Sequence, residues 1–122
     1  MPACPFCSTS SMDIIARNEF CYAIYDKYPV ARGHVLIIPY RHEPDYFSLT
    51  SEEKHGIADL AGPCKTIIAA QFSPIGYNIG INVGRSAGQS VPHCHCHIIP
   101  RYPKDSEDPR GGIRSVVRNA NG

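Results

Sequence analysis

The segment that most constrains the structure reads Gln89-Ser90-Val91-Pro92-His93-Cys94-His95-Cys96-His97-Ile98-Ile99-Pro100. Three of the six histidines of the chain fall in it, at every second position. Because side chains alternate across a β-strand, this spacing predicts a strand with His93, His95 and His97 on one face and Cys94 and Cys96 on the other. A helix would scatter the three rings. We therefore predict a strand that presents three imidazoles together.

A row of imidazoles on one strand face has two chemical uses. Neutral ring nitrogens bind metal ions, and a histidine nucleophile flanked by proton donors can handle a phosphoryl group. A chance cluster on a solvated strand is the alternative. The row follows the turn Gly88-Gln89-Ser90 and runs into the apolar pair Ile98-Ile99, and we interpret it as a site of chemistry.

Size and charge limit the classes of partner. A chain of 122 residues forms one domain, and pairing with a second copy would help such a small chain to bury surface. Twelve basic and eleven acidic side chains leave a formal net charge of +1, which gives no broad electrostatic footprint for nucleic acid or an anionic membrane. We expect neither as a partner, so any nucleotide ligand must be held locally.

The residues from Met1 to Cys7 contain neither a basic n-region nor an apolar h-region, and no stretch approaches the length of a membrane span. We therefore expect a cytoplasmic protein. In that reducing compartment the six cysteines are expected to be thiols or metal ligands rather than a disulfide framework, although an even count leaves bridges open.

The first two cysteines form a Cys4-x-x-Cys7 pair in a proline-containing turn. Two intervening residues let such a loop fold both thiolates onto one ion. A redox pair would instead be expected after a strand and before a helix, whereas this pair opens the chain. Zinc is favoured over redox chemistry, and two unliganded cysteines are the remaining interpretation.

The rest of the chain predicts a mixed scaffold. Apolar runs predict strands over residues 19–25 and 34–39, and Thr50-Ser51-Glu52-Glu53 is a capping box that opens a helix in which Pro63 predicts a kink. A third strand is predicted over residues 77–83, with Asn82 on its small polar face.

Two polar features flank these strands. Asp26 ends the first strand, where its carboxylate could bind a sugar diol or remain a solvated turn residue. The connection over residues 84–90 is rich in glycine, so its backbone N–H groups could approach an anion closely, with a generic hairpin loop as the alternative.

His34 after Gly33, Asn82, the turn Gly88-Gln89-Ser90 and the alternating histidines together resemble the histidine triad (HIT) family over nearly the whole chain. The resemblance implies an α+β fold, a five-stranded antiparallel sheet with helices, in a homodimer that joins two sheets edge to edge into ten strands. It assigns residues 1–102 to the HIT domain and leaves 103–122 as a tail rich in arginine, glycine and proline.

The family acts at the α-phosphate of nucleotides. By resemblance, this chain would hydrolyse purine dinucleoside polyphosphates or nucleoside phosphoramidates through a nucleotidyl-histidine on His95. His97 would contact the phosphate or protonate the leaving group, and His34 would lie beside the triad. The residues implied in nucleotide binding are Asp26 on the ribose, Asn82 near the phosphate or sugar, and Gly88, Gln89, Ser90 and His97 around the phosphoryl group.

His93 has two implied roles. It belongs to the catalytic triad, and in family members that begin with Cys-x-x-Cys the first histidine binds a structural zinc ion together with both cysteines and one further histidine. That set would be Cys4, Cys7, His42 and His93, which suits closed tetrahedral zinc. No organic cofactor is implied, and a further divalent ion would enter only with a polyphosphate substrate.

Three alternatives stay open at the level of sequence. A nucleotidyltransferase or phosphorylase would use the same intermediate with another acceptor replacing water. A nucleotide-binding adaptor would bind the same ligands with little turnover. In a third interpretation His93, His95 and His97 bind a catalytic zinc ion, which the thiols and His42 disfavour by offering a complete site of their own.

Overall fold

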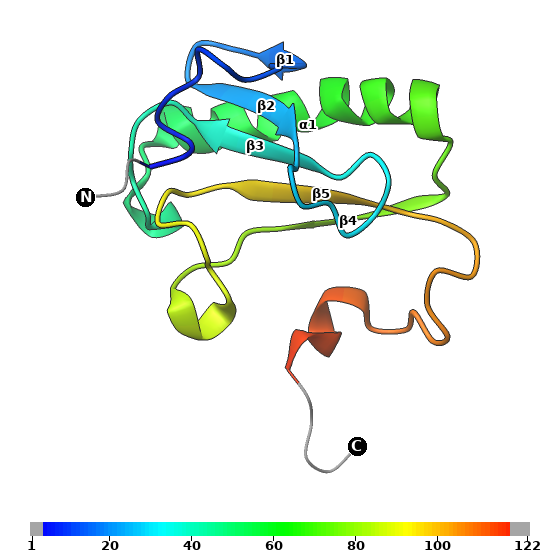
Figure 1. Cartoon of the computed structure of the whole chain (residues 1–122). Coiled ribbons are helices and arrows are strands. Elements are labelled where there is room, and N and C mark those ends of the chain that lie inside the picture. Colours follow the sequence, from blue (N-terminus) through cyan, green and yellow to red (C-terminus); the bar gives the residue numbers. More distant parts are fainter. Residues whose placement is uncertain (1–3, 118–122) are drawn as a thin grey trace.

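A computed structural model describes residues 4–117. A five-stranded sheet forms the centre of the molecule, in the order β1-β2-β3-β5-β4, and all neighbouring strands are antiparallel (Figure 1). The strands are β1 (Ala16–Arg17), β2 (Cys21–Tyr25), β3 (Val35–Pro39), β4 (Gly76–Gly80) and β5 (Cys96–Arg101). The expected five-stranded antiparallel sheet is confirmed.

One long helix, α1 (Ser51–Phe72), runs along one face of the sheet. It begins at the predicted capping box, because the Thr50 hydroxyl accepts from the Glu53 backbone N–H and the Glu53 carboxylate accepts from the Thr50 backbone N–H. The helix continues without a break through Pro63. Its buried side chains, including Ile57, Leu60 and Ile68, pack on inward-facing residues of β2, β3 and β5.

The opposite face of the sheet carries a smaller apolar cluster of Tyr22, Leu36 and Ile38, and the N-terminal segment covers it with Phe6, Met12 and Ile14. Three short 3₁₀ helices complete the described chain: η1 (Tyr46–Ser48), η2 (Arg85–Ala87) and η3 (Gly112–Val116), the last of which lies beside β4. Within residues 4–117, no helix combines the length and the apolar character needed to span a bilayer.

The register of β3 and β5 decides where the histidines point. Val35 pairs with Ile98 and Ile37 with Cys96, and all four face the helix; Leu36 pairs with His97 on the other face. His97 therefore lies on the sheet face that α1 leaves free, as the alternation predicts.

Two strand predictions were too long. The structure ends β4 at Gly80, so Ile81, Asn82 and Val83 follow the strand instead of belonging to it, and Asn82 is exposed. The histidine strand β5 begins only at Cys96, and His93 and His95 precede it. The reason is visible at Cys94, whose backbone N–H donates to the Glu43 carbonyl rather than to a neighbouring strand. The predicted tail includes residues 118–122, which lie outside the described chain.

Candidate active site and metal site

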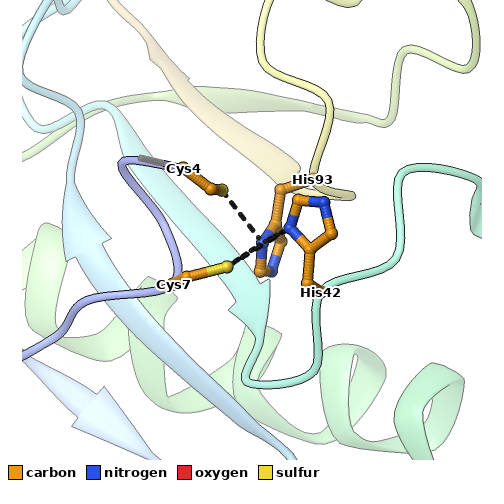
Figure 2. A group of neighbouring side chains, drawn as sticks. All are labelled: Cys4, Cys7, His42 and His93. Carbon is orange, nitrogen blue, oxygen red and sulfur yellow. Dashed lines mark hydrogen bonds between the residues drawn. The ribbon is translucent and has the colours of Figure 1, made fainter. Parts of the chain in front are cut away.

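The N-terminal turn and two histidines from distant parts of the chain form a compact cluster. Figure 2 shows the four side chains that converge: Cys4, Cys7, His42 and His93. One ligand atom from each lies within 4.8 Å of every other. His42 comes from the segment after β3 and His93 from the segment before β5, so the sheet brings both to the Cys4–Cys7 turn.

The spacing of these atoms fits one tetrahedral ion. Zinc–sulfur and zinc–nitrogen bonds of about 2.3 and 2.0 Å require ligand atoms about 3.3–3.8 Å apart. The sulfur of Cys7 lies 3.2 Å from Nδ1 of His42 and 3.6 Å from Nδ1 of His93, and the sulfur of Cys4 lies 3.4 Å from Nδ1 of His93. The donor set is that of a structural zinc site.

His93 is held in the tautomer that a metal requires. Its Nε2 lies 2.8 Å from the Pro39 carbonyl, which can only accept, so Nε2 carries the proton and Nδ1 presents its lone pair to the thiols. The side chain is fully buried, and burial lowers the pKa of His93, which favours the neutral, ligating ring.

His95 is oriented by the neighbouring main chain. Its Nδ1 lies 2.8 Å from the His93 carbonyl, so in the neutral ring Nδ1 donates and Nε2 keeps its lone pair. The residue is only 6% exposed, between the rings of Phe6 and His97, with centroids 5.1 and 5.0 Å away. A buried imidazole with a free Nε2 is the geometry of a nitrogen nucleophile.

His34 and His97 form a hydrogen-bonded pair on the far side of His95. The Val30 backbone N–H donates to Nδ1 of His34 at 3.2 Å, so Nε2 of the neutral His34 ring carries the proton. That Nε2 donates to Nδ1 of His97 at 3.0 Å, which leaves the His97 proton on Nε2. Burial lowers the pKa of His34 against the opposing effect of Asp26, and lowers the pKa of His97 to about 4, so both rings are neutral near pH 7.

A carboxylate stands beside this pair. Oδ2 of Asp26 lies 3.4 Å from Nε2 of His34, and the three ligand-type side chains Asp26, His34 and His97 also fall within 4.8 Å of one another. The Val30 N–H occupies the Nδ1 lone pair of His34, however, so Nε2 has a proton to donate and no lone pair for an ion. We interpret this second group as a hydrogen-bonded relay.

The Gln89 side chain fixes the loop expected to bind phosphate through hydrogen bonds to Gly84, Pro44 and Val91. The Gln89 side-chain oxygen accepts from the Gly84 N–H at 2.9 Å, and its nitrogen donates to the Pro44 carbonyl at 2.8 Å and the Val91 carbonyl at 3.2 Å. Gly88 has a φ of +95°, in the left-handed region that suits glycine. Ser90 is exposed. The roles predicted for Asn82, Gly88, Gln89 and Ser90 toward a phosphoryl group stay predictions.

Three groups at this site were missed by sequence reasoning. Phe6 contacts His95, the Pro39 carbonyl fixes the His93 tautomer, and the Val30 backbone N–H fixes the His34 tautomer. The position of Phe6 inside the Cys4-x-x-Cys7 motif could have indicated that its ring lies near the candidate metal ligands. The two backbone groups leave no trace in residue identity. The three histidines of the row do not form one ligand group. Within residues 4–117, His93 groups with Cys4, Cys7 and His42, and His97 groups with Asp26 and His34.

The structure thus combines an α+β sheet, a buried His95 with its Nε2 free, and a Cys2His2 cluster. The chain matches the HIT domain family over residues 8–104, and it belongs to that family.

The relatives include both cleaving and phosphorolytic proteins. The chain is 32% identical over 111 residues to an AP-4-A phosphorylase of Mycobacterium tuberculosis, a match that covers 86% of this chain and 57% of the relative. It is 38% identical over 92 residues to an asymmetrical bis(5'-nucleosyl)-tetraphosphatase of Schizosaccharomyces pombe, covering 75% of this chain and 50% of the relative. The chain thus spans little more than half the length of these two proteins.

A solved structure supports the fold and bears on the metal. A zinc-bound histidine triad family protein from Mycobacterium smegmatis is 31% identical, with a TM-score of 0.72, and the match covers 81% of this chain and 72% of that one. Together with the cluster geometry, this likeness makes the Cys2His2 group a candidate zinc site.

Proposed function

We propose that this chain is a nucleotide hydrolase that acts at the α-phosphate of purine dinucleoside polyphosphates or nucleoside phosphoramidates through a nucleotidyl-histidine on His95. The observation that carries the proposal is the hydrogen bond from Nδ1 of His95 to the His93 carbonyl, which leaves Nε2 free to attack. Nε2 bonds to the α-phosphorus while the bond to the leaving group breaks, and water then cleaves the P–N bond. Two displacements replace one difficult step.

His97 donates a hydrogen bond from Nε2 to the phosphoryl group or the leaving group. Its relay with His34 keeps the proton on Nε2, and the depressed pKa keeps the ring a neutral donor rather than a standing cation. A neutral imidazole does not give this proton up, so its N–H stabilises the charge that develops on a phosphoryl or leaving-group oxygen, and the leaving group takes its proton from water. His34 contributes by fixing that tautomer.

The nucleotide is held by groups on both sides of the relay. Asp26 accepts from the two ribose hydroxyls. Its carboxylate is oriented toward the site, because Oδ1 accepts from the Tyr28 N–H at 2.9 Å and Oδ2 lies 3.4 Å from Nε2 of His34. Gly88, Gln89 and Ser90 surround the phosphoryl oxygens, with the Ser90 hydroxyl as a donor. The backbone N–H groups of Gly88 and Gln89 instead shape the loop, because they donate to the Arg85 and Gly84 carbonyls. Asn82, just beyond β4, reaches the phosphate or sugar.

Two features are proposed for the assembly. Zinc bound by Cys4, Cys7, His42 and His93 is structural, since all four positions of a tetrahedral ion are filled by side chains. The chain is a homodimer through the β4 edge, because β4 ends the sheet and carries Ile79 with 51% of its surface exposed. Residues 1–102 form the catalytic domain and 103–122 a tail.

A phosphorylase is the second candidate, favoured by the likeness to the AP-4-A phosphorylase. The two activities differ only in the acceptor that cleaves the nucleotidyl-histidine. With diadenosine tetraphosphate, water gives AMP and ATP, whereas inorganic phosphate gives ADP and ATP. Product analysis with and without phosphate therefore separates them. We expect AMP and ATP under both conditions; ADP that appears only with phosphate would replace the hydrolase by the phosphorylase.

A further inference from the structure

Phe6 lies between the two cysteines of the metal cluster and touches the catalytic strand segment. Its ring meets His93 and His95 edge-on, with centroids 5.9 and 5.1 Å away and interplanar angles of 87° and 66°. Edge-to-face contacts of this kind fix the orientation of an aromatic pair as well as adding burial. Phe6 is thus one wall of the pocket that holds the His95 ring.

A second connection joins the cluster to His95 through the main chain. His93 offers Nδ1 to the cluster, and its own carbonyl accepts the Nδ1 proton of His95. The same residue is therefore a candidate ligand and the acceptor that sets the tautomer of the nucleophile. A shift of His93 would disturb the His95 ring directly.

The turn that carries Phe6 is anchored by the packing of Phe6 on Tyr22, Leu36 and Ile38 and by few backbone hydrogen bonds. Residues 4–12 form turns rather than strand, and the local main-chain bond runs from the Cys7 N–H to the Cys4 carbonyl at 3.2 Å. The buried Tyr22 hydroxyl donates to the Phe6 carbonyl. Figure 2 shows both thiols of this turn directed at His42 and His93. Binding of an ion by Cys4 and Cys7, on either side of Phe6, would therefore hold the Phe6 ring against His95.

We propose that Phe6 is a positioning residue that couples the Cys4/Cys7/His42/His93 cluster to His95, so that an occupied cluster holds the nucleophile in its attacking orientation. The inference rests on the proposed function for His95. Coupling between two sites is reciprocal in binding free energy, so a ligand that engages His95 must also raise the affinity of the cluster for its metal.

Two substitutions in the same N-terminal segment test this coupling. Phe6→Leu removes the ring while keeping apolar bulk. Ile14→Ala is the matched control. Ile14 packs on the same Tyr22, Leu36 and Ile38 cluster as Phe6, whereas the ring contact with His95 belongs to Phe6. Zinc per chain, the ¹⁵N imidazole signals of His95 and the rate of nucleotidyl-adduct formation are measured on the zinc-loaded full chain, and the His95 signals are assigned by their absence from His95→Asn.

The expected result for Phe6→Leu is one zinc ion per chain, broadened or shifted His95 signals, and adduct formation slowed about 10- to 100-fold, as for a displaced catalytic group. Ile14→Ala should leave all three unchanged. The proposal is overturned if Phe6→Leu gives the His95 signals and rate of Ile14→Ala. If wild type forms no adduct, the proposed function fails, and the imidazole signals alone, which need no substrate, decide the coupling.

A metal-release measurement gives an independent readout should Phe6→Leu fold poorly. Zinc transfer from wild type to a chromogenic chelator is followed with and without AMP, and the same comparison is made for Phe6→Tyr, which keeps an aromatic ring. At equilibrium with the chelator, AMP should lower the fraction of zinc transferred from both proteins. An equilibrium fraction of transferred zinc that saturating AMP leaves unchanged in wild type would overturn the coupling.

Discussion

His97 illustrates how the site depends on pH. Burial lowers its pKa from 6.5 to about 4, so between these values the unfolded chain binds a proton that the folded chain does not. Stability therefore falls as the pH drops from about 6.5 toward 4. Urea unfolding at pH 7 and pH 5 should show a smaller loss of stability for His97→Asn than for wild type. An equal loss in both proteins would mean that His97 is not the group responsible.

Gly33 and Gly62 predict opposite effects for the same substitution. Gly33 has a φ of +81°, and an added Cβ would lie 2.8 Å from Cδ2 of Phe72. Gly33→Ala should cost about 2 kcal/mol of unfolding free energy, from the strained backbone and the crowding. Gly62 lies inside α1 with no heavy atom within 4 Å of its Cβ position, so Gly62→Ala should stabilise by about 0.5–1 kcal/mol. Equal signs in urea unfolding would contradict this assignment.

Tautomers are the residue-scale features that the sequence could not predict. The pattern of histidines predicted that Cys94 and Cys96 lie apart from the imidazoles, and this is confirmed, because both cysteines belong to the hydrophobic cluster under α1. Which nitrogen of each ring is free depends on backbone carbonyls and N–H groups at Pro39, Val30 and His93. Every residue carries such groups, so no residue type marks them.

At the scale of elements, the start of α1 is under direct control of its sequence. Thr50→Ala removes one half of the capping box and should cost about 1 kcal/mol. The other half should persist, because the Glu53 carboxylate is also held by Arg41 at 2.8 Å and 3.0 Å. Ser51→Ala, at an exposed position one residue later, is the control and should change urea unfolding little. Equal costs for the two variants would argue against the cap.

Elements were predicted best where one physical cause acts locally. The capping box at the start of α1 and the existence of β2 and β3 follow from side chains within each segment. The lengths of β4 and β5 did not follow, because alternation of apolar residues reports burial and not hydrogen-bond pairing. His93 and His95 keep the alternation before β5 begins, since Cys94 bonds to Glu43 across the structure.

For the molecule as a whole, an ion in the candidate zinc site of Cys4, Cys7, His42 and His93 should join the N-terminal turn to the segment before β5. One zinc ion per chain is expected, and removing it with a chelator should lower the thermal unfolding midpoint, because ligands from three distant segments lose their common centre. Cys7→Ser should unfold near the chelated wild-type midpoint and respond little to chelator. The exposed Ser8→Ala is the control that should behave as wild type. A midpoint unmoved by chelation would refute a structural ion.

At this scale the resemblance to the family, carried by residue types at fixed spacing, is what predicted the sheet and the four members of the cluster. It could not predict that Phe6 would bridge the cluster and His95, since that contact arises only once the N-terminal turn lies over the sheet. Long-range placement of a short turn depends on the assembled fold.

The most direct measurement of the central claim is the intact mass of wild type and His95→Ala, quenched during reaction with adenosine 5'-phosphoramidate and, separately, with diadenosine tetraphosphate. The account predicts an added adenylyl mass on wild type alone, with AMP released over time. An adduct on His95→Ala as well, or turnover that survives the substitution, would contradict His95 as the nucleophile.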